Sequence, residues 1–216
     1  PLRLVGSEMC IRDSPKTVAD EAPDFVKRVT AVMMREQGDK LPVSAFPVDG
    51  TWPSATTQWE KRNIAIEIPG WNPELCIQCT KCATICPHAA IRAKFYKNSE
   101  LENAPEGFKH AAFRSKDNPD CSFTIQVAPE DCTGCGLCAT VCPGKSRTEE
   151  GVKALMMVAQ EPIREREAEN FKFFLKLPNP DRSKLTDSVK DVQFRQPLFE
   201  FSGSCAGCAE TSYARL

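Results

Sequence analysis

The chain has 216 residues and a formal net charge of −1, so its length allows one large domain or two small ones. Basic and acidic residues are mixed, without the excess of lysine and arginine that nucleic-acid binding favours. The sequence contains neither an apolar run of the roughly 18 residues that cross a bilayer nor the apolar core of a secretory signal. Composition therefore predicts a soluble chain with no nucleic-acid or membrane partner.

The first predicted element is an amphipathic helix that begins near Pro23 and stops at Gly38. One face of this helix carries the apolar residues Phe25, Val26, Val29, Val32 and Met33. A stripe of this kind is more often ordinary packing than a binding site. Residues 41–53 are rich in proline and glycine turn signals and predict an irregular connector.

Cysteine is the unusual component, because the chain has 12 cysteines and most of them fall into two copies of C-x2-C-x2-C-x3-C-P. The copies contain Cys76, Cys79, Cys82 and Cys86, and Cys132, Cys135, Cys138 and Cys142. Three thiolates at three-residue steps let one tight loop wrap three corners of a [4Fe–4S] cube, and in two-cluster ferredoxins the fourth cysteine ligates the other cluster. The pattern therefore predicts one cluster on Cys76, Cys79, Cys82 and Cys142, and another on Cys132, Cys135, Cys138 and Cys86.

Zinc and disulfide bonds are the alternative uses of so many cysteines. Structural zinc sites usually take two C-x2-C pairs rather than a triplet with a trailing Cys-Pro, and disulfide bonding gives no reason for the repeated register. Gly134 and Gly136 flank Cys135, where the backbone must bend and direct N–H groups toward sulfur. His88 follows the first Cys-Pro, but four cysteines for each cluster leave this histidine nothing to ligate.

Residues 90–96 and 121–127, between the motifs, alternate apolar and polar side chains and predict two half-buried strands. In the first of these strands Arg92, Lys94 and Tyr96 form the polar side. Residues 97–120 predict a polar surface loop between the strands. Cys121 lies outside both motifs and is expected to be a small, partly buried thiol.

After the second motif, residues 155–158 predict a strand, and a helix opens near Pro162. Phe171, Phe173 and Phe174 of this helix are expected to supply packing, whereas its glutamate and arginine run forms a solvated face. Residues 178–197 are polar with three prolines and predict a linker. These elements predict an α+β fold: a bacterial-type two-[4Fe–4S] ferredoxin domain with extra strands and a loop, flanked by helical and irregular segments.

Near its C-terminal end the chain holds one more cysteine pair, Cys205 and Cys208, in a C-x2-C spacing. Two thiolates cannot hold a cube alone, so this pair either uses ligands from elsewhere or consists of redox cysteines. The sequence ends at Leu216 without a helix end or polar tail, and we expect that it is cut off there.

Three blocks, "PVSAFPVDGTWPSATTQWEKRNIA", "CIQCTKCATICPHAAIRAK" and "FSGSCAGCAETSY", together resemble the pyruvate:ferredoxin (flavodoxin) oxidoreductases. The resemblance runs from about Pro15 to Leu216. It implies an internal piece of a large, homodimeric multidomain enzyme that decarboxylates pyruvate on thiamine diphosphate with Mg2+ and transfers the acetyl group to coenzyme A. Such an enzyme passes electrons along three [4Fe–4S] clusters to ferredoxin or flavodoxin, in an anaerobic or low-oxygen cytoplasm.

The resemblance also assigns roles to single residues. It gives the motif cysteines to the two clusters of the ferredoxin-like domain, and Cys205 and Cys208 to the third cluster, beside the thiamine. Glu210 aligns with a glutamate that contacts thiamine diphosphate, although Ala209 and Ser212 replace the family's glycine and proline. None of these residues is a catalytic acid, base or nucleophile, and we expect the isolated chain not to oxidise pyruvate.

The alternative is a free-standing two-cluster ferredoxin or an electron-transfer subunit of another 2-oxoacid oxidoreductase. The third cysteine pair and the long flanks speak against it, because a free ferredoxin needs neither. The predicted organisation is a helical and irregular linker domain at 15–57, the ferredoxin-like domain at 58–175, and at 176–216 a linker with the start of a thiamine-diphosphate domain.

Residues 1–14 lie outside the resemblance. Reverse translation of residues 4–14, "LVGSEMCIRDS", reproduces a common transposase-tagging sequencing adapter read in frame. We therefore interpret residues 1–14 as a gene-assembly artefact, which leaves Cys10 without a function.

Overall fold

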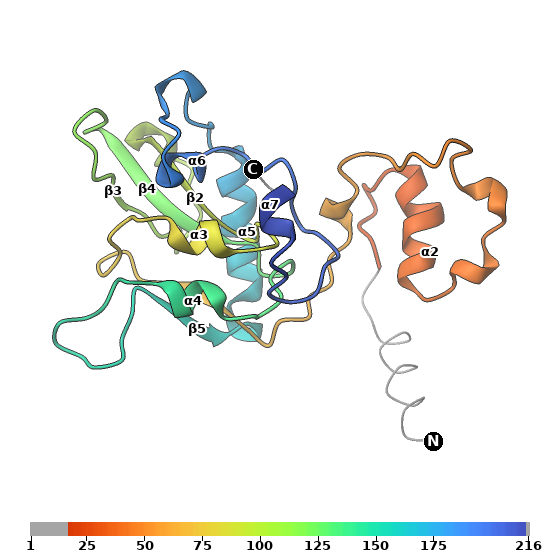
Figure 1. Ribbon diagram of the computed structural model, residues 1–216, viewed down its shortest axis with the longest axis horizontal. Helices are drawn as coiled ribbons and strands as arrows, with labels where there is room; N and C mark the ends of the chain where they lie inside the picture. The colour runs from red at the N-terminus through yellow and green to blue at the C-terminus, as the bar shows by residue number, and fades with distance from the viewer. Residues whose placement is uncertain (1–16, 215–216) are drawn as a thin grey trace. The chain divides into compact units, whose positions relative to one another are not determined.

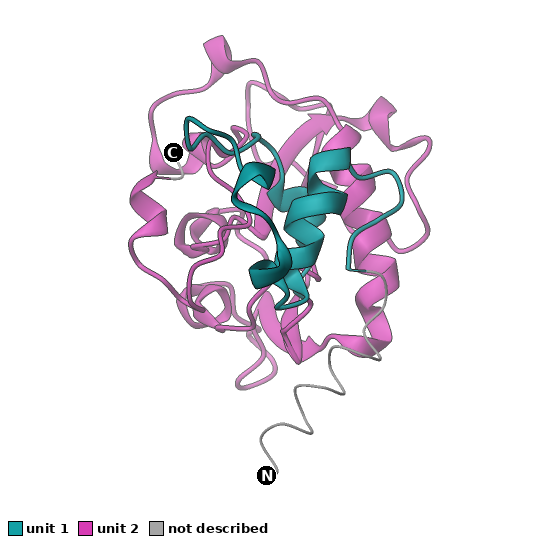
Figure 2. Ribbon diagram, turned by 90° about the vertical axis from the view of Figure 1, so that its right-hand side faces the viewer, with its two compact units in different colours: residues 1–62 teal, residues 63–216 magenta. Residues whose placement is uncertain are grey.

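Residues 17–214 are described by the computed structural model, and the predicted adapter with Cys10 lies outside them. The chain divides into two units (Figure 2), the first ending at Arg62 and the second beginning at Asn63. Each unit has its own packing. No helix among residues 17–214 is long and apolar enough to cross a membrane.

The predicted N-terminal helix is confirmed, but it stops earlier than Gly38. It consists of a π-helical turn, η1 (Val26–Thr30), followed directly by α2 (Ala31–Met34). The early end follows from Glu36, which adopts a left-handed backbone with φ of 58° and so cannot continue the helix. Val26 and Val29 are buried as expected, whereas Met33 is 45% exposed and is not part of the packed face.

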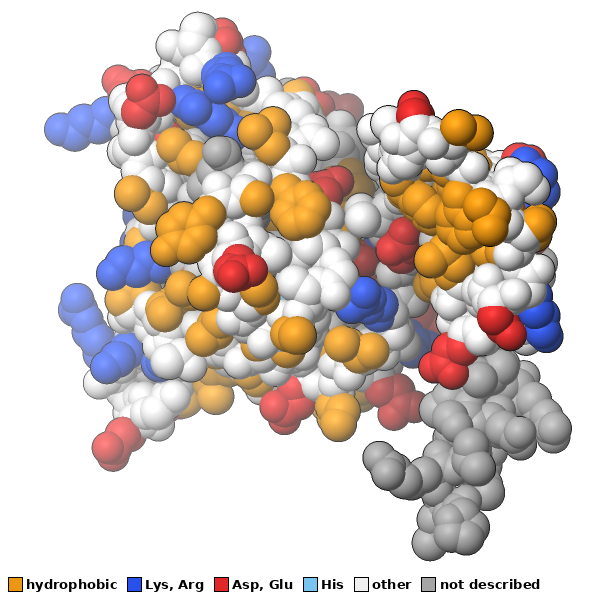
Figure 3. Space-filling view, turned by 45° about the vertical axis from the view of Figure 1, so that its right-hand side comes forward, with side chains coloured by type: hydrophobic (Ala, Val, Ile, Leu, Met, Phe, Trp, Pro, Cys, Tyr) orange, Lys and Arg blue, Asp and Glu red, His pale blue; other side chains and the backbone are white. Residues whose placement is uncertain are grey.

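The rest of unit 1 is irregular, as its proline and glycine signals predict. It contains the short 3-10 turns η2 (Gly38–Lys40), η3 (Val43–Ala45) and η4 (Thr57–Trp59). Trp52 packs edge-on against Phe25, with ring centroids 4.9 Å apart, and lies beside Phe46 at 6.3 Å. Figure 3 shows apolar side chains gathered on one face of this unit. Val43 and Val48 are among its exposed apolar residues.

Unit 2 contains two antiparallel sheets (Figure 1). The first sheet pairs β1 (Glu67–Trp71) with β5 (Leu155–Ala159). The second sheet has β4 (Cys121–Val127) at its centre, between β2 (Ile91–Lys97) and β3 (Ala111–Ala112). The helical elements are α3 (Lys81–Ile85), η5 (Asn98–Leu101), α4 (Leu137–Val141), η6 (Glu161–Ile163), α5 (Arg164–Lys176), η7 (Arg182–Lys184), α6 (Val189–Val192) and α7 (Thr211–Ala214). This mixture of short helices and small sheets confirms the α+β class.

The predicted strands exist, but the expectation that each is half-buried is wrong. Arg92, Lys94 and Tyr96 of β2 are buried as deeply as their apolar neighbours. The cause is α5, which packs against this sheet. Lys94 donates from Nζ to the backbone oxygens of Phe174 at 3.1 Å and Leu177 at 2.7 Å, so it stabilises the C-terminal end of α5.

Two segments predicted as loop and linker also carry structure. Within residues 97–120, β3 adds a strand to the edge of β4. Within residues 178–197, α6 precedes Phe194, which is only 1% exposed in the core of unit 2. Phe194 meets the rings of Phe95 and Phe113 edge-on, with centroids 5.0 and 5.8 Å apart. Aromatic contacts between distant segments therefore order both regions, and polar composition alone does not reveal them.

Candidate metal centre

The structure brings the motif cysteines together in two groups around two small cavities. Cys76, Cys79, Cys82 and Cys142 line the first cavity and form the first cysteine set. Cys132, Cys135, Cys138 and Cys86 line the second cavity and form the second cysteine set. All the cysteines that the structure describes are thiols. No three His, Cys, Asp or Glu side chains within residues 17–214 converge closely enough to hold one metal ion; the thiols surround cavities instead.

Two short helices exchange the fourth cysteine between the sets. Residues 76–80 form the first loop, which leads into helix α3, and α3 ends at its C-cap, Cys86. Residues 132–136 form the second loop, which leads into α4, and α4 ends at its C-cap, Cys142. The helices pack against each other. Each helix therefore carries its last cysteine to the cavity of the other loop, in the arrangement that the repeated motif predicts.

Both loops turn tightly through left-handed backbone conformations. In the first loop these positions are Gln78 and Thr80, each with φ of 58°, and in the second they are Gly134 at 68° and Gly136 at 73°. The turns direct backbone N–H groups at sulfur: Gln78 donates to Sγ of Cys76 at 3.3 Å, and Gly134 donates to Sγ of Cys132 at 3.4 Å. Such hydrogen bonds stabilise a thiolate and adjust the potential of a cluster that it holds.

Burial raises the pKa of the cavity thiols. It raises the pKa of Cys132 and of Cys138 to about 12, and it also raises the pKa of Cys82. For Cys76 burial again raises the pKa, and the nearby Trp71 indole and the backbone N–H of Gln78 work in the opposite direction. Metal ligation requires thiolates, so any metal bound here must displace protons from these groups.

His88, which the sequence analysis leaves without a ligand role, is 2% exposed and lines the second cavity. Its Nδ1 lies 3.1 Å from the backbone oxygen of Ser202. Cys121 lies outside both cavities, pairs with Lys97 across β2 and β4 and is partly buried, as predicted.

The C-terminal pair is placed beside the second set rather than completing a set of its own. Cys205 is exposed and Cys208 partly buried. A Cβ atom added to Gly207, between them, would lie 3.8 Å from Cβ of Cys135. Glu210 is exposed two residues after Cys208.

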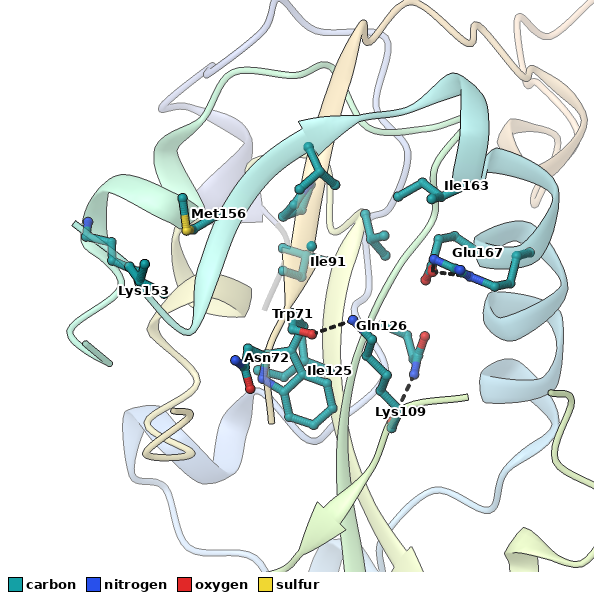
Figure 4. A pocket seen from close by; sticks show the side chains of 16 residues that line it. Trp71, Asn72, Ile91, Lys109, Ile125, Gln126, Lys153, Met156, Ile163 and Glu167 are labelled. Carbon is teal, nitrogen blue, oxygen red and sulfur yellow. Dashed lines mark hydrogen bonds and ion pairs between the residues drawn. The ribbon is translucent and has the colours of Figure 1, made fainter. Parts of the chain in front are cut away.

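A larger cavity of about 390 Å3 lies between the β1–β5 sheet, the β2–β4 strands and α5 (Figure 4). Its walls are mainly apolar, with Ile91 and Ile125 among them. Trp71 and Ile125 line both this cavity and the first cysteine cavity. Lys109 holds this strand end by donating from Nζ to the backbone oxygen of Trp71 at 2.9 Å.

Sequence reasoning missed Trp71, Gln78 and Thr80. Aligning the two motifs would have identified two of these residues, because Gln78 and Thr80 occupy the positions of Gly134 and Gly136 and are therefore expected to share their left-handed backbone. Trp71 has no such signal, since β1 precedes the motif and its pairing with β5 is not visible in the sequence.

Two family models match the chain: a 4Fe-4S dicluster domain over residues 75–146 and a domain of unknown function over residues 12–65. The second match starts inside the stretch that we interpret as an adapter, and that interpretation stays a prediction.

Relatives extend the similarity over most of the chain. It is 52% identical over 210 residues to a pyruvate-flavodoxin oxidoreductase of a Nostoc species, an alignment that covers 97% of this chain and 18% of the relative. A relative from Escherichia coli named for the same activity is 52% identical over 217 residues, covering 100% of this chain and 18% of the relative. A pyruvate:ferredoxin oxidoreductase of Moorella thermoacetica is 47% identical over 204 residues, covering 94% of this chain and 17% of the relative.

The chain thus spans less than one fifth of the length of these relatives. Their names agree on one family across three organisms, and the matched domain coincides with the two cysteine sets. The chain therefore belongs to the pyruvate-flavodoxin oxidoreductase family, of which it represents one segment built around a 4Fe-4S dicluster domain.

Proposed function

We propose that this chain is the electron-transfer segment of an enzyme that oxidises pyruvate to acetyl-CoA and CO2 and delivers the electrons to flavodoxin or ferredoxin. The observation that carries the proposal is the pair of cavities, each lined by four cysteines with the fourth supplied by the other motif. Each set would hold one [4Fe–4S] cluster, and such a cluster supplies one-electron transfer when bound.

The residues around the cavities fit that role. A cubane needs one thiolate for each iron, and each cavity offers four cysteines. The N–H groups of Gln78 and Gly134 already point at cysteine sulfur, so the loops are preorganised for the charge of a thiolate-bound cluster. Helices α3 and α4 pack together and bring the two sets close, which favours electron exchange between them.

For the rest of the enzyme the proposal rests on resemblance. Cys205 and Cys208 would supply two ligands of a third cluster, completed by residues elsewhere in the longer protein. Glu210 would contact thiamine diphosphate, which with Mg2+ supplies the decarboxylation chemistry. The position of Gly207 against Cys135 supports the third site as the neighbour of the second cysteine set.

We further propose, from the family resemblance, that the complete enzyme is a homodimer. Because low-potential clusters are oxygen-sensitive, it would work in an anaerobic or low-oxygen cytoplasm. The partners are flavodoxin or ferredoxin and the remainder of the enzyme's own chain. Residues 15–57, 58–175 and 176–216 would be its linker domain, its ferredoxin-like domain and the beginning of its thiamine-diphosphate domain.

Anaerobic reconstitution followed by iron and sulfide analysis and EPR of the reduced chain tests the proposal. We expect about eight irons per chain and signals from two interacting four-iron clusters. Coenzyme A-dependent pyruvate oxidation should be undetectable with this chain alone. Stoichiometric zinc, or about twelve irons in a monomeric chain, would contradict the assignment of the cysteine sets.

A further inference from the structure

The segment that precedes the C-terminal cysteine pair is fastened to the segment that follows Cys86. We call residues 200–204 the strap. We propose that Arg92 and Glu200 are positioning residues that hold the strap, and through it Cys205 and Cys208, against the second cysteine set. This inference rests on the proposed function, because it concerns how a third electron-transfer site is kept next to the second.

The first residue of the strap forms an ion pair, between Glu200 and Arg92. The side chain of Arg92 is 8% exposed and that of Glu200 is 31% exposed. Arg92 is fixed in turn, because its Nε donates to the backbone oxygen of Ala89 at 2.8 Å. A buried guanidinium needs a partner, and the residue that meets this need comes from the strap, which lies 108 positions later in the chain.

Aromatic rings enclose the same guanidinium. The Cζ atom of Arg92 lies 5.1 Å from the ring centroid of Phe201 and 5.6 Å from that of Phe171 on α5. The two rings also touch each other, with centroids 6.2 Å apart. Arg92 is therefore held between the strap and α5 by cation–π contacts as well as by its ion pair.

The strap continues along the segment after Cys86. The backbone N–H of Phe201 donates to the backbone oxygen of His88 at 2.9 Å, and the imidazole of His88 lies against Ser202. His88 comes two residues after Cys86, a member of the second cysteine set. The strap is thus bonded directly to the segment that presents one of the second set's ligands.

The cysteine pair has little burial of its own to hold it. Cys205 is exposed, Cys208 is partly buried, and the helix that follows them, α7, spans only four residues. Immediately before the strap, Leu198 is 84% exposed and Phe199 is 41% exposed. The contacts of Arg92, His88 and Phe201 therefore anchor the segment that leads into the pair, and they set how closely Gly207 rests on Cys135.

The test uses the complete chain, reconstituted anaerobically, with Glu200→Ala as the variant and Glu200→Gln as the conservative rescue. Asp187→Asn is the matched control, because it removes an ion pair to Arg195 in which Asp187 is 96% exposed. One readout is hydrogen exchange at the Phe201 amide. The other is the fluorescence lifetime of a dye on Cys205, which energy transfer to the clusters shortens. For this second readout Cys10, Cys121 and Cys208 are replaced by serine in every sample.

We expect Glu200→Ala to raise the exchange rate of the Phe201 amide by roughly ten- to a hundredfold, the size of a lost hydrogen bond to a charged group. The dye lifetime should lengthen while the iron content stays at the value of the parent chain. With Glu200→Gln both changes should be smaller than with Glu200→Ala, since an amide oxygen still accepts from Arg92. Asp187→Asn should change neither the exchange rate nor the dye lifetime.

Unchanged exchange and lifetime in an iron-loaded Glu200→Ala chain would overturn the inference. So would loss of iron in that variant, because Glu200 would then support the second cluster rather than position the pair. If the parent chain binds no clusters, the proposed function fails instead, and the exchange of the Phe201 amide still decides whether the ion pair holds the strap.

Discussion

The two cysteine loops follow one spacing pattern but solve the same backbone problem differently. Each needs two left-handed residues between its cysteines, and the second loop uses glycine at both positions, Gly134 and Gly136. The first loop uses Gln78 and Thr80, although a residue with a Cβ atom pays about 1–2 kcal/mol for this conformation. The first loop must therefore gain stability elsewhere, whereas the second depends on the freedom of its own backbone.

Side-chain hydrogen bonds are what the first loop gains. The amide of Gln78 donates from Nε2 to the oxygen of Ala112 at 2.7 Å, and its Oε1 accepts from the N–H of Arg114 at 2.8 Å. Both partners belong to the segment around β3, so the loop and the insertion between the motifs stabilise each other. Gln78 is 2% exposed and Thr80 1% exposed, whereas Cys135 at the middle of the second loop is exposed.

The largest expected effect comes from removing a cysteine that one motif supplies to the cavity of the other. Cys142→Ser lies in the second motif, yet it should remove the first cluster, because Cys142 lines the first cavity. We expect the iron content to fall from about eight to about four per chain. Iron analysis and EPR after anaerobic reconstitution measure the change.

Cys121→Ser is the matched control for this prediction, because Cys121 lies outside both cavities, and it should keep the full iron content. A Cys142→Ser chain whose remaining EPR signal is abolished by Cys79→Ser, but not by Cys135→Ser, would contradict the exchange of ligands.

The second largest effect is expected next to Cys142, at Gly144. A Cβ atom there would lie 2.6 Å from the backbone oxygen of Leu75 and 2.8 Å from Cβ of Ala154. The Leu75 oxygen is part of the backbone and the Ala154 Cβ is bonded directly to it, so neither atom can rotate aside, and Gly144→Ala should destabilise the chain by about 3 kcal/mol. Thermal loss of the visible cluster absorbance measures the effect under anaerobic conditions.

Gly151→Ala is the control, because a Cβ atom at Gly151 meets nothing within 4 Å. Its backbone, with φ of 80°, adds strain but no clash. Equal losses of thermal stability in the two variants would mean that the close approach at Gly144 does not destabilise Gly144→Ala.

Side-chain support of the first loop gives the third prediction. Gln78→Ala leaves the Arg114 N–H and the Ala112 oxygen without their partner, and we expect the local opening free energy at Arg114 to fall by about 2 kcal/mol. Hydrogen exchange at the Arg114 amide measures this change. The N–H of Gly134 should not change, because the second loop has no comparable side-chain tie to β3; faster exchange at both sites would mean that the substitution loosens the whole domain.

The two groups of cysteines could be predicted from the sequence because the repeated spacing places three of them on one loop and the fourth at the end of the short helix that follows; that the fourth serves the other group is a property of the motif type and depends on the packing of α3 against α4. The two long strands and α5 could also be predicted, since their periodicity is a local property. The sequence could not reveal that Arg92 and Lys94 are buried, because their partners, Glu200 and the end of α5, are distant in the chain. The burial of a polar side chain can be predicted only when its hydrogen-bond or ion-pair partner is known.

The smallest effects are expected when the residue at a left-handed position of one loop is replaced by the type found in the other, a residue with a Cβ atom for glycine or glycine for such a residue. Gly136→Ala introduces no clash, because nothing lies within 4 Å of the added Cβ, so only the left-handed backbone strain of about 1 kcal/mol should appear. Thr80→Gly relieves the same strain in the first loop but loses the hydrogen bond from Thr80 Oγ1 to the Cys79 oxygen at 2.8 Å. The gain and the loss are both about 1 kcal/mol, so stability should hardly change. Anaerobic thermal denaturation of both variants tests the pair: a large loss for Thr80→Gly would show that side-chain contacts dominate the first loop, and a clear gain would show that backbone strain does.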